Sequence, residues 1–139
     1  MTNRAYNNKN SGCLQIALTQ ALCTSLQNVS LDQCGLGDHE ANAIAEALSK
    51  NNYLKSISIK SNGIKNSGAI AIFQSFKYMS CGLEQLDISE NLFDDEAGKD
   101  LVEAIRSKNR YLLRIIMKKN QILNYGKPLL AAIKFNTQI

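Results

Sequence analysis

Few side chains in this sequence could do chemistry. His39 is the only histidine, so a Ser-His-Asp or Cys-His catalytic arrangement would have to use it, and it lies where a helix is expected to begin. Asp94, Asp95 and Glu96 could suggest a site for a hard cation, but the ligand spacing of a calcium loop is absent. Their place at a helix start favours an interaction with the helix dipole instead. We therefore predict no catalytic residue, no metal site and no cofactor, and a protein that is not an enzyme.

The cysteines also give little support for a metal site. Cys13, Cys23, Cys34 and Cys81 lie far apart and include no C-x-x-C pair. We interpret them as reduced thiols of an intracellular, cytoplasmic protein, with a secreted disulfide scaffold as the weaker alternative. No run approaches the roughly 18 apolar residues that span a bilayer, and the first ten residues are polar, unlike the apolar region expected of a signal sequence. We expect no membrane insertion.

One stretch, Leu83 to Phe93, has an apolar spacing that is neither helical nor purely strand-like. Apolar residues stand at its relative positions 1, 4, 6 and 11, and an asparagine stands at position 9. This spacing matches the L-x-x-L-x-L-x-x-N/C-x-L signature of a leucine-rich repeat, in which a short strand runs into a turn. The pattern recurs at offsets of 28 and 29 residues, with the ninth position at Cys34, Asn62, Asn91 and Asn120.

The repeats define the organisation of the chain. Its 139 residues, 45% of them hydrophobic, suit one domain with a continuous core. Residues 1–10 are polar and are expected to form a flexible lead-in, whereas 11–139 form a single domain that begins with a capping helix at 11–25. Four repeats follow, at 26–53, 54–82, 83–111 and 112–139.

Each repeat is expected to place a strand beside the strand of the next repeat, which gives a four-stranded parallel sheet. Positions 4 and 6 of each strand point into the core, and positions 3, 5 and 7 point to the opposite face. The position-9 asparagine is expected to bond main-chain groups that the turn would otherwise leave unpaired, and Cys34 begins this row with a weaker donor. Asp38 is expected to cap the first returning helix. Tyr53, Tyr78 and Tyr111 fall at or after helix ends, where we expect them to cover the core.

With helices returning on the other side, the spacing resembles the ribonuclease-inhibitor-like subfamily of leucine-rich repeat proteins over residues 26 to about 133. The resemblance implies an α/β right-handed solenoid, a horseshoe segment with the sheet on its concave face and helices on its convex face. The family pattern prefers Gly six residues after the asparagine; Gly68 and Gly126 fit, but Glu40 and Ala97 replace it in the other copies. Members occur in cytosolic immune receptors, GTPase-activating proteins and bacterial effectors, and they act mostly by gripping another protein on the concave face.

The expected concave face changes from neutral through acidic to basic along the stack. A partner with opposed charges in matching order would gain specificity and association rate. The alternative is that charges on adjacent strands only pair with one another, for instance Asp87 with Arg114 or Glu90 with Lys119. The candidate protein-binding residues are Lys60, Gln85, Asp87, Glu90, Arg114, Ile116, Lys118 and Lys119.

The function predicted from these features is a non-catalytic module that binds a partner protein of unknown identity. It would act as an adaptor in the cytoplasm, or as an effector in the cytosol of a host cell. The alternative is nucleic-acid or acidic-surface binding through the basic fourth-repeat region, which is disfavoured because its charges divide between a helix end and a strand. Self-association through the C-terminal end is expected from Leu129, Leu130 and Ile133.

Overall fold

A computed structural model describes residues 27–51, 53–78, 83–106 and 114–122. In these ranges the strands β1 (Asn28–Ser30), β2 (Ser56–Ser58), β3 (Gln85–Asp87) and β4 (Arg114–Ile116) alternate with the helices α2 (Asp38–Lys50), α3 (Asn66–Ser75) and α4 (Asp95–Arg106). The expected capping helix at 11–25 and the helix of the last repeat lie outside the described residues. No helix in the described ranges is both long enough and apolar enough to cross a membrane.

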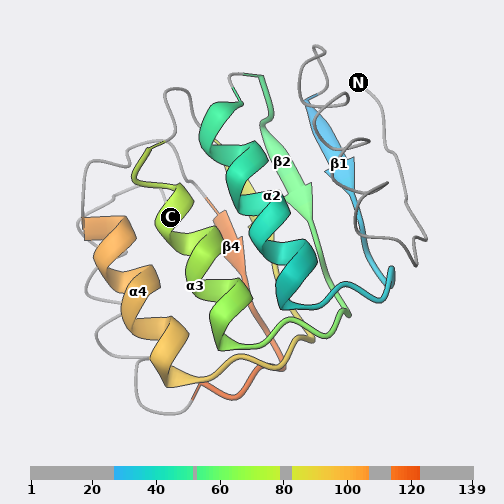
Figure 1. The fold of residues 1–139 in the computed structure, drawn as a ribbon, viewed down its shortest axis with the longest axis vertical. Coiled ribbons are helices and arrows are strands. Elements are labelled where there is room, and N and C mark those ends of the chain that lie inside the picture. Colours follow the sequence, from blue (N-terminus) through green and yellow to red (C-terminus); the bar gives the residue numbers. More distant parts are fainter. Residues whose placement is uncertain (1–26, 52, 79–82, 107–113, 123–139) are drawn as a thin grey trace.

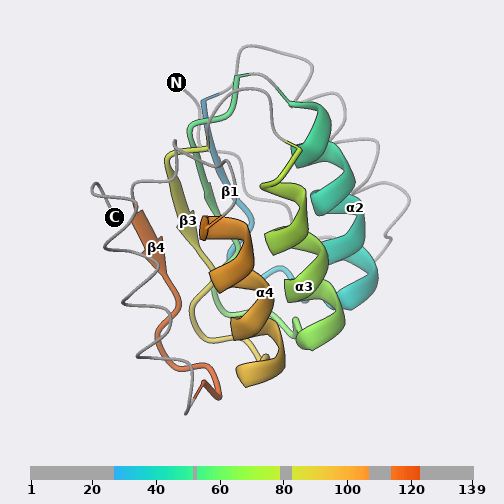
Figure 2. The same ribbon diagram turned by 90° about the vertical axis from the view of Figure 1, so that its left-hand side faces the viewer.

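The strands form one parallel sheet in chain order, β1-β2-β3-β4, as the repeat pattern predicts. Equivalent positions of successive repeats pair directly, so Val29 lies beside Ile57, Ile57 beside Leu86, and Leu86 beside Ile115. The helices return on one side of this sheet, and the other side faces away from them (Figures 1 and 2). The result is a two-layer unit in which each helix follows its own strand.

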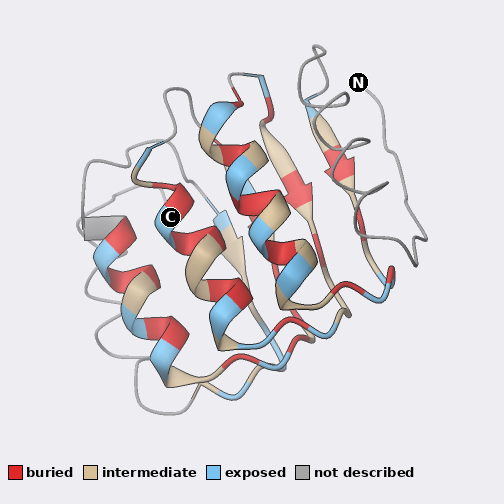
Figure 3. Cartoon of the chain, in the orientation of Figure 1, coloured by how far each residue is buried: buried red, intermediate tan, exposed pale blue. Residues whose placement is uncertain are grey.

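The core lies between the two layers, where buried positions of strands and helices meet (Figure 3). Strand positions 4 and 6 are buried in the first three repeats, which confirms the predicted alternation. In the fourth repeat, Ile115 and Met117 are only partly buried and pack against the edge of the core. The buried strand residues are Val29, Leu31, Ile57, Ile59, Leu86 and Ile88.

Small residues let the helices pack closely behind the sheet. The predicted inward side of α2 is buried at Ala41, Ile44, Ala45 and Leu48. A Cβ on Gly68 would lie 2.7 Å from the Cβ of Ala41, which is closer than any side-chain carbon tolerates. The glycine that follows the asparagine by six residues therefore permits close contact between α3 and α2.

Asp38 caps a helix, as predicted, but not the helix that was predicted. The residue preceding α2 is Gly37, whose N–H donates to Glu40 Oε2 at 2.9 Å. Asp38 Oδ1 instead accepts the backbone N–H groups of Lys65 at 2.8 Å and Gly68 at 3.1 Å, so it caps the start of α3. The reason is stacking: helix starts of adjacent repeats lie side by side, and a carboxylate in one helix reaches the free N–H groups of the next.

The tyrosines were also predicted wrongly where they can be assessed. Tyr53 and Tyr78 are 53% and 74% exposed, so neither covers the core, and Tyr111 lies outside the described residues. The loop before β2 is closed by Asn51, whose Oδ1 accepts the N–H groups of Tyr53 at 2.8 Å and Leu54 at 2.6 Å. Because these bonds turn the backbone and bury Leu54, the tyrosine ring remains in solvent.

Candidate functional site

The candidate site is the outer face of the sheet, by which we mean the side opposite the helices. It carries positions 3, 5, 7 and 8 of each repeat. Side chains on this face are intermediate or exposed, except that of Ser89, which is buried. Four features fix how these side chains lie: an asparagine row at its edge, a row of left-handed residues, bonds between position-7 residues, and a group of ion pairs.

The asparagine row joins each repeat to the one before it. Asn62 Nδ2 donates to the carbonyl oxygens of Leu31 at 3.1 Å and Ile59 at 2.9 Å, and its Oδ1 accepts the N–H groups of Cys34 and Leu36, both at 3.0 Å. These bonds satisfy main-chain groups from two repeats at once. The predicted role of the position-9 asparagine is confirmed.

The row weakens at both of its ends. Cys34 provides only a thiol in place of the amide, and its Sγ donates to the carbonyl oxygen of Asp32 at 3.4 Å. Asn120 Nδ2 donates to Ile88 O at 3.0 Å and Met117 O at 3.3 Å, but its buried Oδ1 accepts no hydrogen bond from the residues that the structure describes. Among the described residues, the Asn120 side chain therefore makes fewer hydrogen bonds to the preceding repeat than the side chains of Asn62 and Asn91 do.

A row of left-handed residues precedes the asparagines. Gln33, Ser61, Glu90 and Lys119, at position 8, have φ values of 55°, 57°, 56° and 57°. None is glycine or asparagine, the residues that adopt this conformation most easily, so residue type did not indicate the feature. The signal that could have found it is the repeat position, because the chain must turn immediately before the asparagine.

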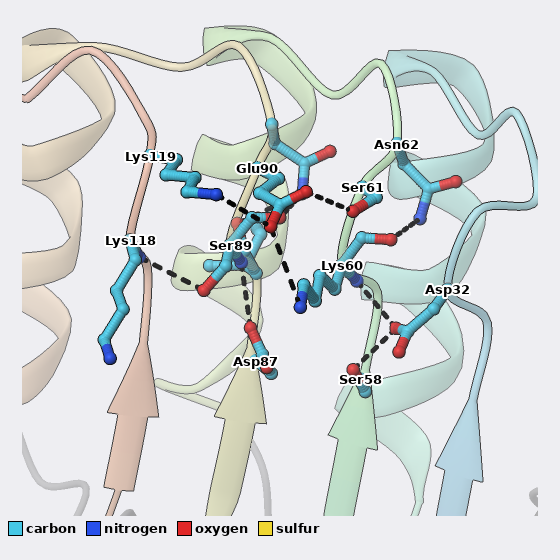
Figure 4. A network of polar contacts seen from close by, with 12 residues as sticks. Asp32, Ser58, Lys60, Ser61, Asn62, Asp87, Ser89, Glu90, Lys118 and Lys119 are labelled. Atoms are coloured by element: carbon cyan, nitrogen blue, oxygen red, sulfur yellow. Dashed lines mark hydrogen bonds and ion pairs between the residues drawn. The ribbon is translucent and has the colours of Figure 1, made fainter.

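Position 7 carries a second set of bonds between repeats. Asp32 Oδ1 accepts the backbone N–H of Lys60 at 2.8 Å, and it also accepts Ser58 Oγ at 2.6 Å. Ser89 Oγ likewise accepts the backbone N–H of Lys118 at 3.1 Å. In both cases the position-7 side chain of one repeat accepts a hydrogen bond from the position-7 backbone N–H of the next repeat (Figure 4). Asp32 and Ser58 were not among the predicted site residues.

The position-7 row is interrupted between β2 and β3. Lys60 occupies the accepting place there, and its ammonium group can only donate. The N–H of Ser89 is bonded instead within its own strand, to Asp87 Oδ1 at 3.0 Å. The Asp87 carboxylate thus supplies the acceptor that Lys60 lacks.

This bond explains why one predicted ion pair was wrong. Among the described residues no ion pair joins Asp87 to Arg114, whose side chain is exposed. An aspartate bonds readily to the backbone two residues along the chain, and that local bond turns the carboxylate toward Ser89. The interstrand partner that the register suggested is not used.

The other predicted ion pair is confirmed and proves to be part of a larger group. Glu90 Oε1 lies 3.7 Å from Lys119 Nζ and also 3.7 Å from Lys60 Nζ, and Ser61 Oγ donates to Glu90 Oε2 at 2.7 Å (Figure 4). The Ser61 hydrogen bond, followed by the two lysines, holds the pKa of Glu90 below its ordinary value. Glu90 therefore joins β2, β3 and β4 through one ionised carboxylate.

The structure gathers the eight predicted residues on one face but gives them different surroundings. Lys60, Glu90 and Lys119 are held together, and Asp87 is bonded to the backbone. Gln85, Arg114 and Lys118 are exposed, and Ile116 is half-buried. Within the described ranges, no three His, Cys, Asp or Glu side chains come together as metal ligands do.

These repeats, with their parallel strands, returning helices and asparagine row, form a leucine-rich-repeat-like fold. No protein-family model matches the chain. It is similar to two mouse proteins, NACHT, LRR and PYD domains-containing protein 4C, with 29% identity over 136 residues, and protein 9C, with 29% over 98 residues. The aligned parts are 95% and 68% of this chain but 14% and 10% of those relatives, so the chain spans only a small share of their length.

Solved structures agree on the fold. The tropomodulin C-terminal domain of Caenorhabditis elegans has a TM-score of 0.79 at 15% identity, over 99% of this chain and 84% of that one. The leiomodin-1 actin-binding site 2 has a TM-score of 0.73 at 21% identity, over 99% and 80%. The leucine-rich repeat predicted from the sequence is thus supported by related sequences and by the fold.

Proposed function

We propose that this chain is a non-catalytic protein-recognition module that binds a partner protein through the outer face. The observation that carries the proposal is a sheet face that α2, α3 and α4 leave uncovered and that presents fixed and free charges side by side. Lys60, Glu90 and Lys119 provide the fixed group, whereas Arg114 and Lys118 provide exposed cations. Such a face offers a partner complementary charge together with a rigid backbone.

The proposal also draws on the similar proteins. The relatives carry LRR domains by name, and one similar structure is named as an actin-binding site. In the same proposal, the outer face is the concave side of a right-handed horseshoe segment of the ribonuclease-inhibitor-like kind. Cytoplasmic location, an adaptor or effector role and self-association through the C-terminal end remain predictions from the sequence.

The test is a capture experiment with matched variants. The tagged chain and two charge-reversed variants are cross-linked to proteins of a cell lysate and compared by quantitative mass spectrometry. Arg114→Glu with Lys118→Glu alters the outer face, and Lys65→Glu with Lys99→Glu makes the same charge change on the exposed helix side. We expect a partner that the first variant loses and the second retains.

Two results would overturn this assignment. Partners that survive the outer-face reversal, or that both variants lose equally, would place binding elsewhere or show it to be unspecific. Tight binding to single-stranded RNA or to DNA that falls steeply with salt, measured by fluorescence anisotropy, would favour the nucleic-acid alternative instead.

A further inference from the structure

We infer that the segment recognised by the outer face is an extended acidic stretch of the partner, with an apolar residue between two carboxylates. This inference rests on the proposed function and specifies its ligand. The receiving surface is a strip of three residues on β4 and the turn that follows it, Arg114, Ile116 and Lys118, which we call the β4 strip. It presents a cation, an apolar side chain and a second cation in that order.

The strip has a regular spacing because Arg114 and Ile116 lie in β4, and the backbone remains paired with the third repeat up to Lys118, where the turn begins. Ile88 N–H donates to Ile116 O and Glu90 N–H donates to Lys118 O, both at 2.8 Å, so pairing with the third repeat continues beyond β4 itself. Alternate residues of an extended chain share a face and stand roughly 6–7 Å apart. An extended ligand running beside the strip repeats the same spacing, so acidic, apolar and acidic residues at i, i+2 and i+4 match it.

The charge of the strip is not neutralised by neighbouring carboxylates. In the part of the chain that the structure describes, neither Arg114 nor Lys118 is in an ion pair. The carboxylate of Asp87 is turned to the Ser89 N–H, and that of Glu90 is held by Lys60 and Lys119. The cations of the strip therefore remain available to anionic groups of a ligand.

The middle residue of the strip favours a peptide ligand over a nucleic acid. Ile116 is half-buried beside Asp87, in register with it, and offers an aliphatic surface between the two cations. An aliphatic side chain of a ligand gains by covering this surface. Single-stranded nucleic acid usually requires aromatic side chains on which bases stack, and none of the outer-face residues that the structure describes is aromatic.

The experiment uses a random 12-residue peptide library displayed on phage and selected against the whole chain. We expect the selected peptides to be enriched in Asp or Glu at two positions four residues apart, with Leu, Ile or Val midway. A synthetic peptide of the enriched sequence should bind at least about tenfold more weakly to Arg114→Glu with Lys118→Glu, as measured by fluorescence anisotropy. Lys65→Glu with Lys99→Glu should leave the affinity unchanged.

A charge exchange makes the test stricter. Replacing both acidic residues of the peptide with Lys should abolish binding to the parent chain and restore it to the Arg114→Glu, Lys118→Glu variant. Circular dichroism checks that this variant is folded, and the milder Arg114→Gln, Lys118→Gln variant should give an intermediate loss. Restoration of binding by exchange cannot come from damage to the fold.

The outcomes separate this inference from the proposed function. Selected peptides that are neutral or basic, or a library that yields no enrichment, would overturn the inference that the ligand is acidic. Peptides that bind the outer face through Lys60 or Gln85, and are indifferent to the β4 strip, would overturn the inference but leave the proposed function standing. Peptides indifferent to every outer-face variant would overturn both.

Discussion

The Asp87 carboxylate is expected to stabilise the fold by accepting one partly buried hydrogen bond. Ser89 is 3% exposed, and its N–H donates to Asp87 Oδ1 at 3.0 Å. Asp87→Ala leaves this N–H without an acceptor, which costs about 1–3 kcal/mol in the free energy of unfolding. Asp87→Asn retains the oxygen, so its cost should be under about half of that. Urea denaturation of the two variants, compared at equal m value, measures the difference.

The same reasoning predicts that Lys60 and Asp87 are coupled. Lys60 lies where Asp32 and Ser89 accept the next repeat's N–H, so Lys60→Ser places a hydroxyl acceptor within reach of the Ser89 N–H. Lys60→Ser alone loses an exposed ion pair with Glu90 and should cost about 0–1 kcal/mol. In the Lys60→Ser, Asp87→Ala double variant, about 1–2 kcal/mol of the Asp87→Ala cost should return.

Two results would refute this account of Asp87. If the single costs simply add in the double variant, the hydroxyl at position 60 does not replace the carboxylate. If Asp87→Asn destabilises as much as Asp87→Ala, the charge matters rather than the hydrogen bond to Ser89. Lys60→Ala serves as the matched control, since it removes the ammonium group without supplying an acceptor and should give no recovery.

Three further predictions concern other parts of the outer face and its support. Asn91→Ala should cost about 3 kcal/mol or more and Asn120→Ala less than half as much, because Asn91 bonds through both ends of its amide whereas Asn120 Oδ1 has no partner among the described residues; urea unfolding ranks them. Gly68→Ala should cost about 1–3 kcal/mol through the contact with Ala41, and adding Ala41→Gly should recover part of the loss in the same assay. The pKa of Glu90 is lowered, so its stabilisation is present above the ordinary glutamate pKa and is lost as pH falls through the folded value. Unfolding midpoints of the parent and Glu90→Gln should therefore converge between pH 7 and pH 3, and a constant gap would contradict this.

The sheet and core could be predicted because their signals lie within one repeat. The alternation at Val29 and Leu31 fixes which side of the strand is buried, and the copies at Ile57 and Leu86 repeat that decision. The asparagine at position 9 was predictable for the same reason, since a turn of the main chain needs both a donor and an acceptor at that point. Position and residue type together were sufficient for these features.

The bonds between repeats could not be predicted, because they depend on which group of a neighbouring repeat lies within reach. Asp38 looks like the cap of its own helix in sequence, yet its carboxylate bonds the N–H groups of Lys65 and Gly68. Asp87 looks like an interstrand ion-pair partner, yet it bonds the backbone of Ser89. Each aspartate had several acceptable partners, and distances of about 3 Å decided between them.

Lys60 connects the structural and functional arguments about the outer face. Position 7 of the first three repeats is Asp32, Lys60 and Ser89, and of these only the lysine side chain cannot accept a hydrogen bond. The acceptor for the Ser89 N–H is therefore missing at Lys60, and the Asp87 carboxylate takes its place. Lys60 also draws Glu90 into the fixed ion-pair group, so both acidic side chains of the third repeat on the outer face are occupied. A lysine just after β2 thereby leaves Arg114 and Lys118, two repeats away, free to meet the carboxylates of a partner. Lys60→Ser should then lower the affinity of the β4 strip for an acidic peptide, because the released Asp87 and Glu90 compete for those cations.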